Sequence, residues 1–296
     1  PCFVHWPDGD LGAPRDIGGL TQVQDILPTL CDMCAMKPPD DANLDGISLV
    51  GALRATAPVP EERVLCMNYS RMPQFDYPTP DAQSIMRREG AAVLYKRWRL
   101  LEGTALYDLD ADPLQNRNVI DEYRDVAAVM TAALDAWWRD VEPVANQVQH
   151  VIIGSDEENP MMLTACEWMD VFVDQQRQVR VAERKNGYWH LRVARAGTYT
   201  FELRPWPRES DLAMTDACPA THLTDGAMEE GVALPITRAR MMIERQMYTR
   251  AVEPGAATAT FTVTLDQGDT LLHTWFDDAR HQPICGAYYV HVSRHD

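Results

Sequence analysis

The sequence predicts an α/β first part, residues 1–143, followed by an all-β sandwich or jelly roll over residues 144–296. Three observations support this division. Residues 92–138 combine short alternating strands with a helical stripe, which is typical of mixed α/β packing. Beyond residue 149 the pattern changes to several short alternating strands, which is typical of a sandwich. The length of 296 residues is enough for two domains at about 150 residues each.

The N-terminal stretch predicts one strand and one helix. Cys2–Trp6 is an apolar run and is expected to form a buried strand. A helix is expected from Asp25 to Met36, with Asp25 as its N-cap and Pro28 tolerated in its first turn. Its predicted buried stripe consists of Ile26, Leu27, Leu30, Met33 and Cys34. Val64–Met67 is a further candidate strand.

A hairpin is predicted next. Ala92, Leu94, Trp98 and Leu100 alternate with mostly polar neighbours, as in a strand with one buried face. Glu102-Gly103 supplies a turn, after which Ala105, Leu106 and Tyr107 return as the second strand.

An amphipathic helix is expected to pack on this hairpin. The turn Asp110–Pro113 separates the two, since proline lacks a backbone donor and aspartate favours turns. Asp121 is the predicted N-cap. The apolar stripe that follows contains Tyr123, Val126, Ala127, Met130, Leu134, Trp137 and Trp138. Pro143–Gln149 is the predicted linker.

The second part is predicted to be all-β. Asn186-Gly187 is expected to form a two-residue hairpin turn. The predicted strands are Gln178–Arg184, Tyr188–Ala194, Thr198–Leu203, Ala259–Leu265, Thr270–Phe276 and Ala287–Val292.

Composition and motifs exclude several classes of function. The net charge of -17 argues against nucleic-acid binding, which needs a basic surface. No apolar run approaches the ~20 residues of a membrane span. The sequence contains no nucleotide-binding loop, metalloprotease motif or serine-hydrolase motif. Its histidines lack the spacing of metal ligands. The acidic pairs Asp8/Asp10, Asp40/Asp41 and Asp110/Asp112 could bind calcium, but solvated carboxylates are more common in such turns, so no catalytic or metal-binding residue is assigned.

Three separated motifs resemble the C-terminal half of formylglycine-dependent sulfatases of the bacterial arylsulfatase type. In order they are Asp25-Ile-Leu-Pro-Thr-Leu30, then Asp45-Gly-Ile-Ser-Leu49, and then Leu106-Tyr-Asp-Leu109 with Asp112-Pro113 and Asn118. The opening run Pro-Cys-Phe-Val-His-Trp-Pro is similar to the segment that follows the last catalytic lysine of these enzymes. Segments of the second part, such as residues 197–209, are similar to one appended to some bacterial arylsulfatases.

The resemblance implies an alkaline-phosphatase-like fold, with residues 1–143 as the C-terminal portion of the catalytic domain. The nucleophile motif C/S-x-P-x-R, which becomes formylglycine, is missing from the sequence. We therefore expect the chain to be an inactive C-terminal fragment whose partner is the N-terminal half of the same protein. That half would supply the formylglycine and a calcium site. Most bacterial sulfatases are periplasmic or extracellular, and the same location would follow here.

Substrate contacts are expected in the loop 68–80, which is rich in proline, tyrosine and arginine. The resemblance places this region near the mouth of the pocket. Arginine can bind sulfate bidentately, and aromatic faces suit sugars or aryl groups. The candidate substrate-binding residues are Tyr69, Arg71, Phe75 and Tyr77. The more common alternative for such a loop is that its aromatic residues pack on their own domain.

Two other functions remain open. A phosphonate or phosphodiester hydrolase of the same superfamily shares much of this C-terminal pattern. Alternatively, the second part could be a non-catalytic carbohydrate-binding sandwich that uses Trp189, Trp206 or Trp275, although tryptophans of this kind are more often part of a core. The substrate of the hydrolase would be a sulfated small molecule or glycan, and a homo-oligomer is possible.

Overall fold

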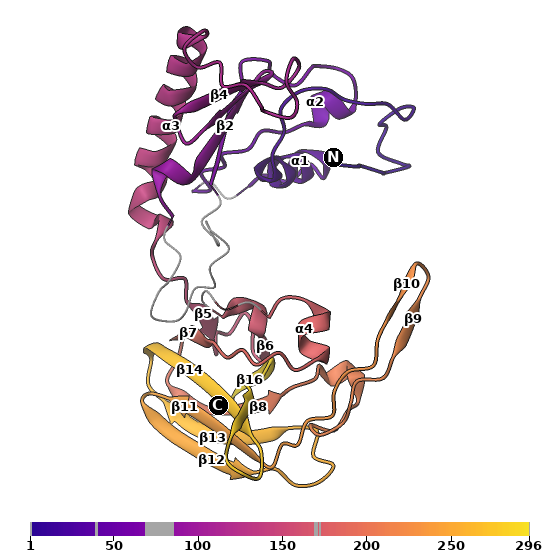
Figure 1. Cartoon of the computed structure of the whole chain (residues 1–296), viewed down its shortest axis with the longest axis vertical. Helices are drawn as coiled ribbons and strands as arrows, with labels where there is room; N and C mark the ends of the chain where they lie inside the picture. Colours follow the sequence, from indigo (N-terminus) through magenta and orange to yellow (C-terminus); the bar gives the residue numbers. More distant parts are fainter. Residues whose placement is uncertain (1, 39–40, 69–85, 169–170, 172, 296) are drawn as a thin grey trace. The chain divides into compact units, whose positions relative to one another are not determined.

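The described residues form two compact units. A computed structural model describes residues 2–38, 41–68, 86–168, 171 and 173–295 (Figure 1). Unit 1 consists of the described residues up to Asn146, and unit 2 of those from Gln147 onward. Within these ranges, no helix combines the length and the apolar character that crossing a membrane requires.

Unit 1 contains an antiparallel sheet with one long helix along it (Figure 1). The helix α3 buries Met130 and Leu134 completely in the core that it shares with the sheet. The strands lie in the order β1 (Val64–Asn68), β2 (Ala91–Tyr95), β3 (Trp98–Leu101) and β4 (Ala105–Asp108), and α3 spans Arg124–Ala145. The expected small antiparallel sheet with a packed helix is therefore present, with four strands.

The predicted single strand over residues 92–100 is two antiparallel strands, β2 and β3, and this changes which residues of β2 are buried. Tyr95 pairs with Trp98 across a turn at Lys96 and Arg97, so Val93 pairs with Leu100. Residues directly opposite each other share a face of the sheet. Val93 is therefore buried beside Leu100, whereas Leu94 is on the other face and only partly buried. Trp98 and Leu100 are buried as predicted, but Ala92 and Leu94 are not, because the predicted alternation continued through this turn.

Helix α3 confirms the centre of its predicted apolar stripe but not its predicted ends, and Tyr123 of that stripe is 40% exposed. Ala127, Met130 and Leu134 are buried as expected. The N-cap is Tyr123, while Asp121 forms an exposed ion pair with Arg124. The helix also continues through Pro143 to Ala145, past the point where the linker was expected to begin.

The first fifty residues of unit 1 differ most from the prediction. They contain the short helices η1 (Val23–Asp25) and α1 (Ile26–Met33), and α2 (Val50–Leu53) begins at their end. One further short helix, η2 (Arg88–Gly90), directly precedes β2. Cys2–Trp6 forms no strand, and Phe3 is 92% exposed. Helix α1 ends at Met33 rather than Met36. A strand needs a neighbouring strand for its backbone hydrogen bonds, and none of the described residues supplies one for Cys2–Trp6.

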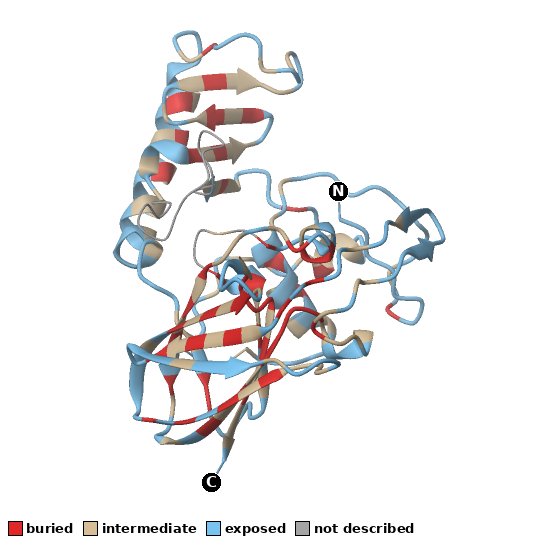
Figure 2. Ribbon diagram, turned by 60° about the horizontal axis from the view of Figure 1, so that its bottom comes forward, coloured by how far each residue is buried: buried red, intermediate tan, exposed pale blue. Residues whose placement is uncertain are grey.

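Unit 2 is a β-sandwich of two sheets. The larger has the order β12-β11-β14-β7-β5 with β15 paired to β14, and the smaller has the order β13-β8-β16-β6. Buried residues alternate along these strands (Figure 2), and both sheets contribute them to one apolar core. The strands are β5 (Val151–Ile153), β6 (Met161–Thr164), β7 (Tyr188–Val193), β8 (Gly197–Arg204), β11 (Arg238–Ile243), β12 (Gln246–Ala251), β13 (Ala259–Leu265), β14 (Gly268–Asp277), β15 (Pro283–Cys285) and β16 (Tyr289–His295).

The short elements of unit 2 include the main corrections in this part. The predicted strand Gln178–Arg184 overlaps the helix α4 (Gln176–Arg180), which starts with a capping box between Gln175 and Gln178. Since no strand precedes it, Asn186-Gly187 is not a hairpin turn. The remaining elements are η3 (Ala165–Glu167), η4 (Arg208–Ser210) and the exposed hairpin β9 (Thr221–Leu223) and β10 (Gly226–Met228).

Candidate functional site

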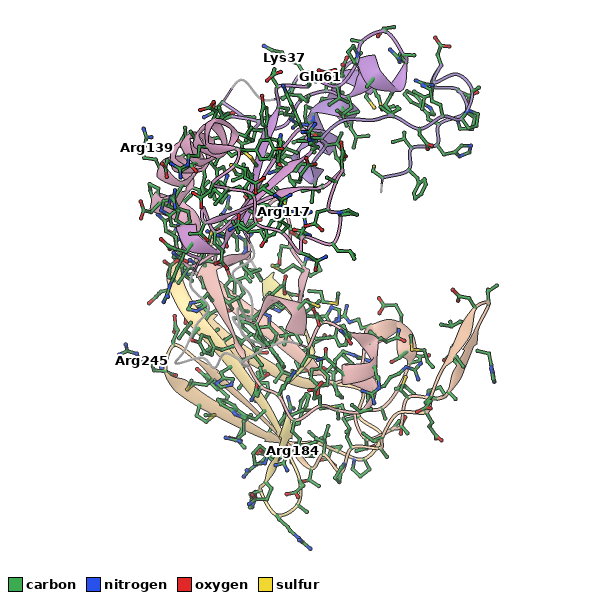
Figure 3. All side chains as sticks on the ribbon, turned by 45° about the horizontal axis from the view of Figure 1, so that its top comes forward. Lys37, Glu61, Arg117, Arg139, Arg184 and Arg245 are labelled. Atoms are coloured by element: carbon green, nitrogen blue, oxygen red, sulfur yellow. The ribbon has the colours of Figure 1, made fainter. Side chains whose placement is uncertain are left out.

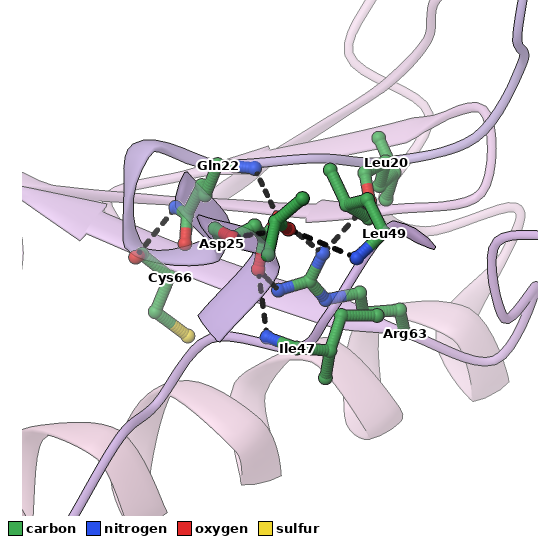
Figure 4. A network of polar contacts seen from close by, with 8 residues as sticks. Leu20, Gln22, Asp25, Ile47, Leu49, Arg63 and Cys66 are labelled. Atoms are coloured by element: carbon green, nitrogen blue, oxygen red, sulfur yellow. Dashed lines mark hydrogen bonds and ion pairs between the residues drawn. The ribbon is translucent and has the colours of Figure 1, made fainter. Parts of the chain in front are cut away.

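Asp25 is the centre of a buried polar network in unit 1 (Figure 4). Its carboxylate accepts backbone N–H bonds from Gln22 at 2.8 Å and from Ile47 at 3.0 Å. Arg63 forms a bidentate ion pair with the same carboxylate, with Nη1 at 2.7 Å from Oδ2 and Nη2 bonded to Oδ1. Burial acts to raise the pKa of Asp25, but these donors outweigh it and the pKa lies below its ordinary value.

The first two sequence motifs are joined through this network. Thr29 donates its hydroxyl to the carbonyl oxygen of Asp25 at 2.6 Å and accepts the backbone N–H of Leu49 at 2.9 Å. Gly46 is needed at the same junction, because a Cβ there would lie 2.0 Å from the carbonyl oxygen of Gln24. The Asp25–Leu30 motif and the Asp45–Leu49 motif therefore fix each other's position.

This geometry assigns Asp25 a structural role. Its two carboxylate oxygens already receive four donors, so the side chain has little capacity left for a proton or a metal ion. It occupies the N-cap position of α1 as predicted, but its side chain makes no capping hydrogen bond to the first turn of that helix. It instead completes the capping box of η1 with Gln22. Arg63, its main partner, was not singled out from the sequence.

The polar side chains of the third motif, Leu106–Asn118, also form hydrogen bonds within the fold. The Asn118 Oδ1 atom accepts the backbone N–H groups of Leu106 at 3.0 Å and Ile120 at 3.1 Å. Asp108 accepts a bond from the Arg97 Nε atom at 3.0 Å and from the Asp110 backbone N–H at 3.1 Å. Asn118 therefore holds β4 to the segment that leads into α3, whereas Asp108 fixes the turn directly after β4 and binds Arg97.

Helix α1 presents an apolar surface to solvent. Ile26 is 47% exposed, Leu27 54% and Leu30 52%, while Thr29 is the buried residue of this helix. The predicted burial of this stripe is therefore wrong. The polar network of Asp25 and Thr29 holds the opposite face of the helix against the unit, so the apolar face points away from it.

The predicted substrate contacts Tyr69, Arg71, Phe75 and Tyr77 lie outside the described residues and stay predictions. Elsewhere, no three histidine, cysteine, aspartate or glutamate side chains of the described ranges are grouped as metal ligands would be.

The three tryptophans considered for sugar binding differ in burial. Trp189 and Trp206 are buried in the core of unit 2, as the core interpretation predicts. Trp275 is partly exposed on the outer face of the larger sheet, where the Arg240 guanidinium lies 4.8 Å from its ring centre. Its other neighbour is His273, with ring centres 4.0 Å apart. Trp275 is therefore the accessible member of the three.

Parts of the chain are similar in structure to parts of several known proteins. No family model matches the chain, and no curated protein matches it. A putative sulfatase from Bacteroides thetaiotaomicron is 24% identical over 42% of this chain and 26% of its own, with a TM-score of 0.30. A phosphonate monoester hydrolase of Agrobacterium radiobacter is 25% identical over 38% of this chain and 24% of its own, with a TM-score of 0.27.

A third likeness is to a family 35 carbohydrate-binding module from Clostridium thermocellum. It is 12% identical over 46% of this chain and 98% of the module, with a TM-score of 0.26. The chain spans about a quarter of the length of the sulfatase and of the phosphonate hydrolase. Sulfatases, a phosphonate hydrolase and carbohydrate-binding modules are thus among the structures to which parts of this chain are similar.

Proposed function

We propose that the chain is the C-terminal portion of an arylsulfatase-like sulfuric ester hydrolase and is inactive by itself. The observation that carries this proposal is the order of the three motifs, Asp25–Leu30, Asp45–Leu49 and Leu106–Asn118. In unit 1 the polar side chains of these motifs bind backbone groups of their own fold. Such residues build a scaffold, which fits a chain whose reactive groups would lie in another part of the protein.

The exposed face of α1 supports the proposed partner. Ile26, Leu27 and Leu30 lie on the surface of a helix whose opposite side is fixed by hydrogen bonds. Covering apolar surface of this kind stabilises a protein by about 25 cal/mol per Å². We propose that the N-terminal half of the same hydrolase covers this face and supplies the formylglycine and the calcium site.

A direct assay tests the proposal. The chain produced together with the polypeptide encoded upstream of it should hydrolyse p-nitrophenyl sulfate in the presence of calcium, and the chain alone should not. Hydrolysis of p-nitrophenyl phenylphosphonate without sulfatase activity would support the phosphonate hydrolase instead. Hydrolysis of the sulfate ester by the chain alone would overturn the proposal.

A carbohydrate-binding role for unit 2 is a second candidate, and one observation favours it. Trp275 is accessible on a sheet face, whereas Trp189 and Trp206 are enclosed. An exposed aromatic ring suits the apolar face of a sugar. This role does not compete with the first, because a binding module and a catalytic part can belong to one protein.

A further inference from the structure

A small pocket beside Trp275 in unit 2 is lined by basic residues, whereas the chain as a whole is acidic. It has a volume of about 190 Å³ and lies where β15 joins the edge of β14. The pairing register shifts there, between Phe276 and Asp277, and such bulges commonly lie next to binding sites. Its lining residues are Arg184, Lys185, Asn186, Trp275, Pro283, Ile284 and Cys285.

The pocket is locally basic in an acidic protein. The whole chain has 44 acidic and 27 basic residues, yet two cations and no carboxylate line this pocket. Lys185 forms an ion pair with Glu183 at 3.0 Å. Arg184 is exposed, its Nη2 atom lies 3.5 Å from the carbonyl oxygen of Pro283, and no carboxylate of the described residues pairs with it. A guanidinium in this position can bind an anion through two of its N–H groups.

The apolar wall of the pocket is held in place. The Arg240 guanidinium lies over the ring of Trp275 and is itself anchored to Asp277, with Nε–Oδ2 and Nη2–Oδ1 distances of 2.7 and 2.8 Å. Asn186 donates its side-chain amide to the carbonyl oxygen of Thr274 at 2.8 Å, which ties the loop before β7 to β14. A wall fixed in this way loses little conformational entropy when a ligand binds.

Size, charge and apolar surface together restrict the ligand. A volume of 190 Å³ corresponds to about six water molecules at about 30 Å³ each, which is the size of a single ring. The Trp275 indole can contact the C–H face of a sugar, while Arg184 binds a carboxylate or sulfate on the same ring. We propose that this pocket binds one acidic sugar residue. The proposal rests on the carbohydrate-binding role proposed for unit 2, and it does not depend on the proposed hydrolase.

The experiment is calorimetric titration of the full chain with methyl β-D-glucuronide and with methyl β-D-glucoside, which lacks the charge. We expect the glucuronide to bind at least about ten-fold more tightly, a difference of about 1.4 kcal/mol. Methyl glucoside 6-sulfate distinguishes a preference for sulfate from one for carboxylate. Added salt should weaken binding of the acidic sugars more than that of the glucoside, because Arg184 is exposed.

Two variants and a matched control locate the site. Arg184→Ala should reduce glucuronide affinity to the level of the glucoside and leave the glucoside unchanged. Trp275→Ala should weaken both sugars, and Trp275→Phe, which keeps an aromatic ring, should restore part of the loss. Arg245→Ala removes an equal charge from the turn between β11 and β12 and should change neither (Figure 3).

Three results would overturn the proposal. They are a failure of both acidic sugars to bind at millimolar concentration, equal affinity for charged and uncharged rings, and an equal loss in the Arg245 variant and the Arg184 variant. Because Arg184 is exposed, its replacement leaves the fold intact, so loss of binding in that variant cannot come from unfolding. Sulfatase activity of the parent would be unaffected by any of these results, so the two proposals fail independently.

Discussion

The N-terminal part of unit 1 and the sandwich of unit 2 are built on different interactions. In the first, the best-buried groups of the α1 region are polar, namely Asp25 and Thr29, and the apolar side chains of α1 face solvent. In the second, residues of two sheets share one large apolar core that includes Trp189 and Phe276. Hydrophobic burial is the main driving force of folding. We therefore expect unit 2 to be stable alone, whereas the apolar face of α1 is left without cover within the described residues.

Separating the units tests this difference most strongly. Residues 147–296 produced alone should fold and unfold in one cooperative transition, because their apolar core is drawn from that range. Residues 1–146 alone should unfold at a much lower denaturant concentration. The measurement is urea denaturation followed by circular dichroism. If the two fragments unfolded at the same urea concentration, the proposed difference in their stability would be wrong.

Breaking the Asp25 network should have the next largest effect. Asp25→Ala leaves Arg63, which is 11% exposed, without its partner and frees two partly buried backbone N–H groups. Loss of one member of a buried ion pair costs about 3–5 kcal/mol. Amide hydrogen exchange should report this loss in unit 1 and not in unit 2. Glu61→Ala, at an exposed position of the same unit, is the control and should stay within about 0.5 kcal/mol.

The two units should also respond to acid at different pH. Burial, aided by the charge of Arg240, lowers the pKa of His273 from 6.5 to about 4. The folded state therefore disfavours the protonated ring, so unit 2 keeps this stability above pH 6.5 and loses it as the pH falls toward 4. The loss should be about 2 kcal/mol after allowance for partial exposure.

Asp25 acts at lower pH. Its pKa lies below the ordinary 3.8, so its contribution to unit 1 is complete above that value and disappears only at more acidic pH. Unfolding free energies measured from pH 7 to 4 should thus fall for unit 2 first. His273→Gln should reduce this slope, and the remainder should come from His190 and His291, whose pKa values burial also lowers. A slope that is unchanged in that variant would assign the whole effect to other groups.

The smallest effect on stability is expected at the face of α1. Leu27→Gln and Leu30→Gln replace side chains that are already about half exposed, so the unfolding free energy should change by no more than about 0.5 kcal/mol. The same changes should weaken association with the proposed N-terminal half, measured by co-purification. Leu114→Gln, at a residue 80% exposed in the same unit, is the matched control. A destabilisation of several kcal/mol would mean that the face is covered within the chain.

The sequence by itself determined the elements whose pattern is local. The stripe of Ala127, Met130 and Leu134 predicted the buried face of α3, and the alternation in Ala259–Leu265 predicted β13 with its bounds. Each follows from the period of one element, 3.6 residues in a helix and 2 in a strand. The order of the three motifs was likewise visible in the sequence.

Tertiary structure decided which faces are buried and which side chains meet. The turn at Lys96-Arg97 put Val93 rather than Leu94 in the core. The α1 stripe faces solvent because hydrogen bonds from distant segments hold the other side, and Arg63 reaches Asp25 across 38 residues of sequence. Arg184 and Trp275 meet at one pocket from elements that are far apart in the chain. A local period fixes the two faces of an element, but the choice between them depends on partners that the period does not specify.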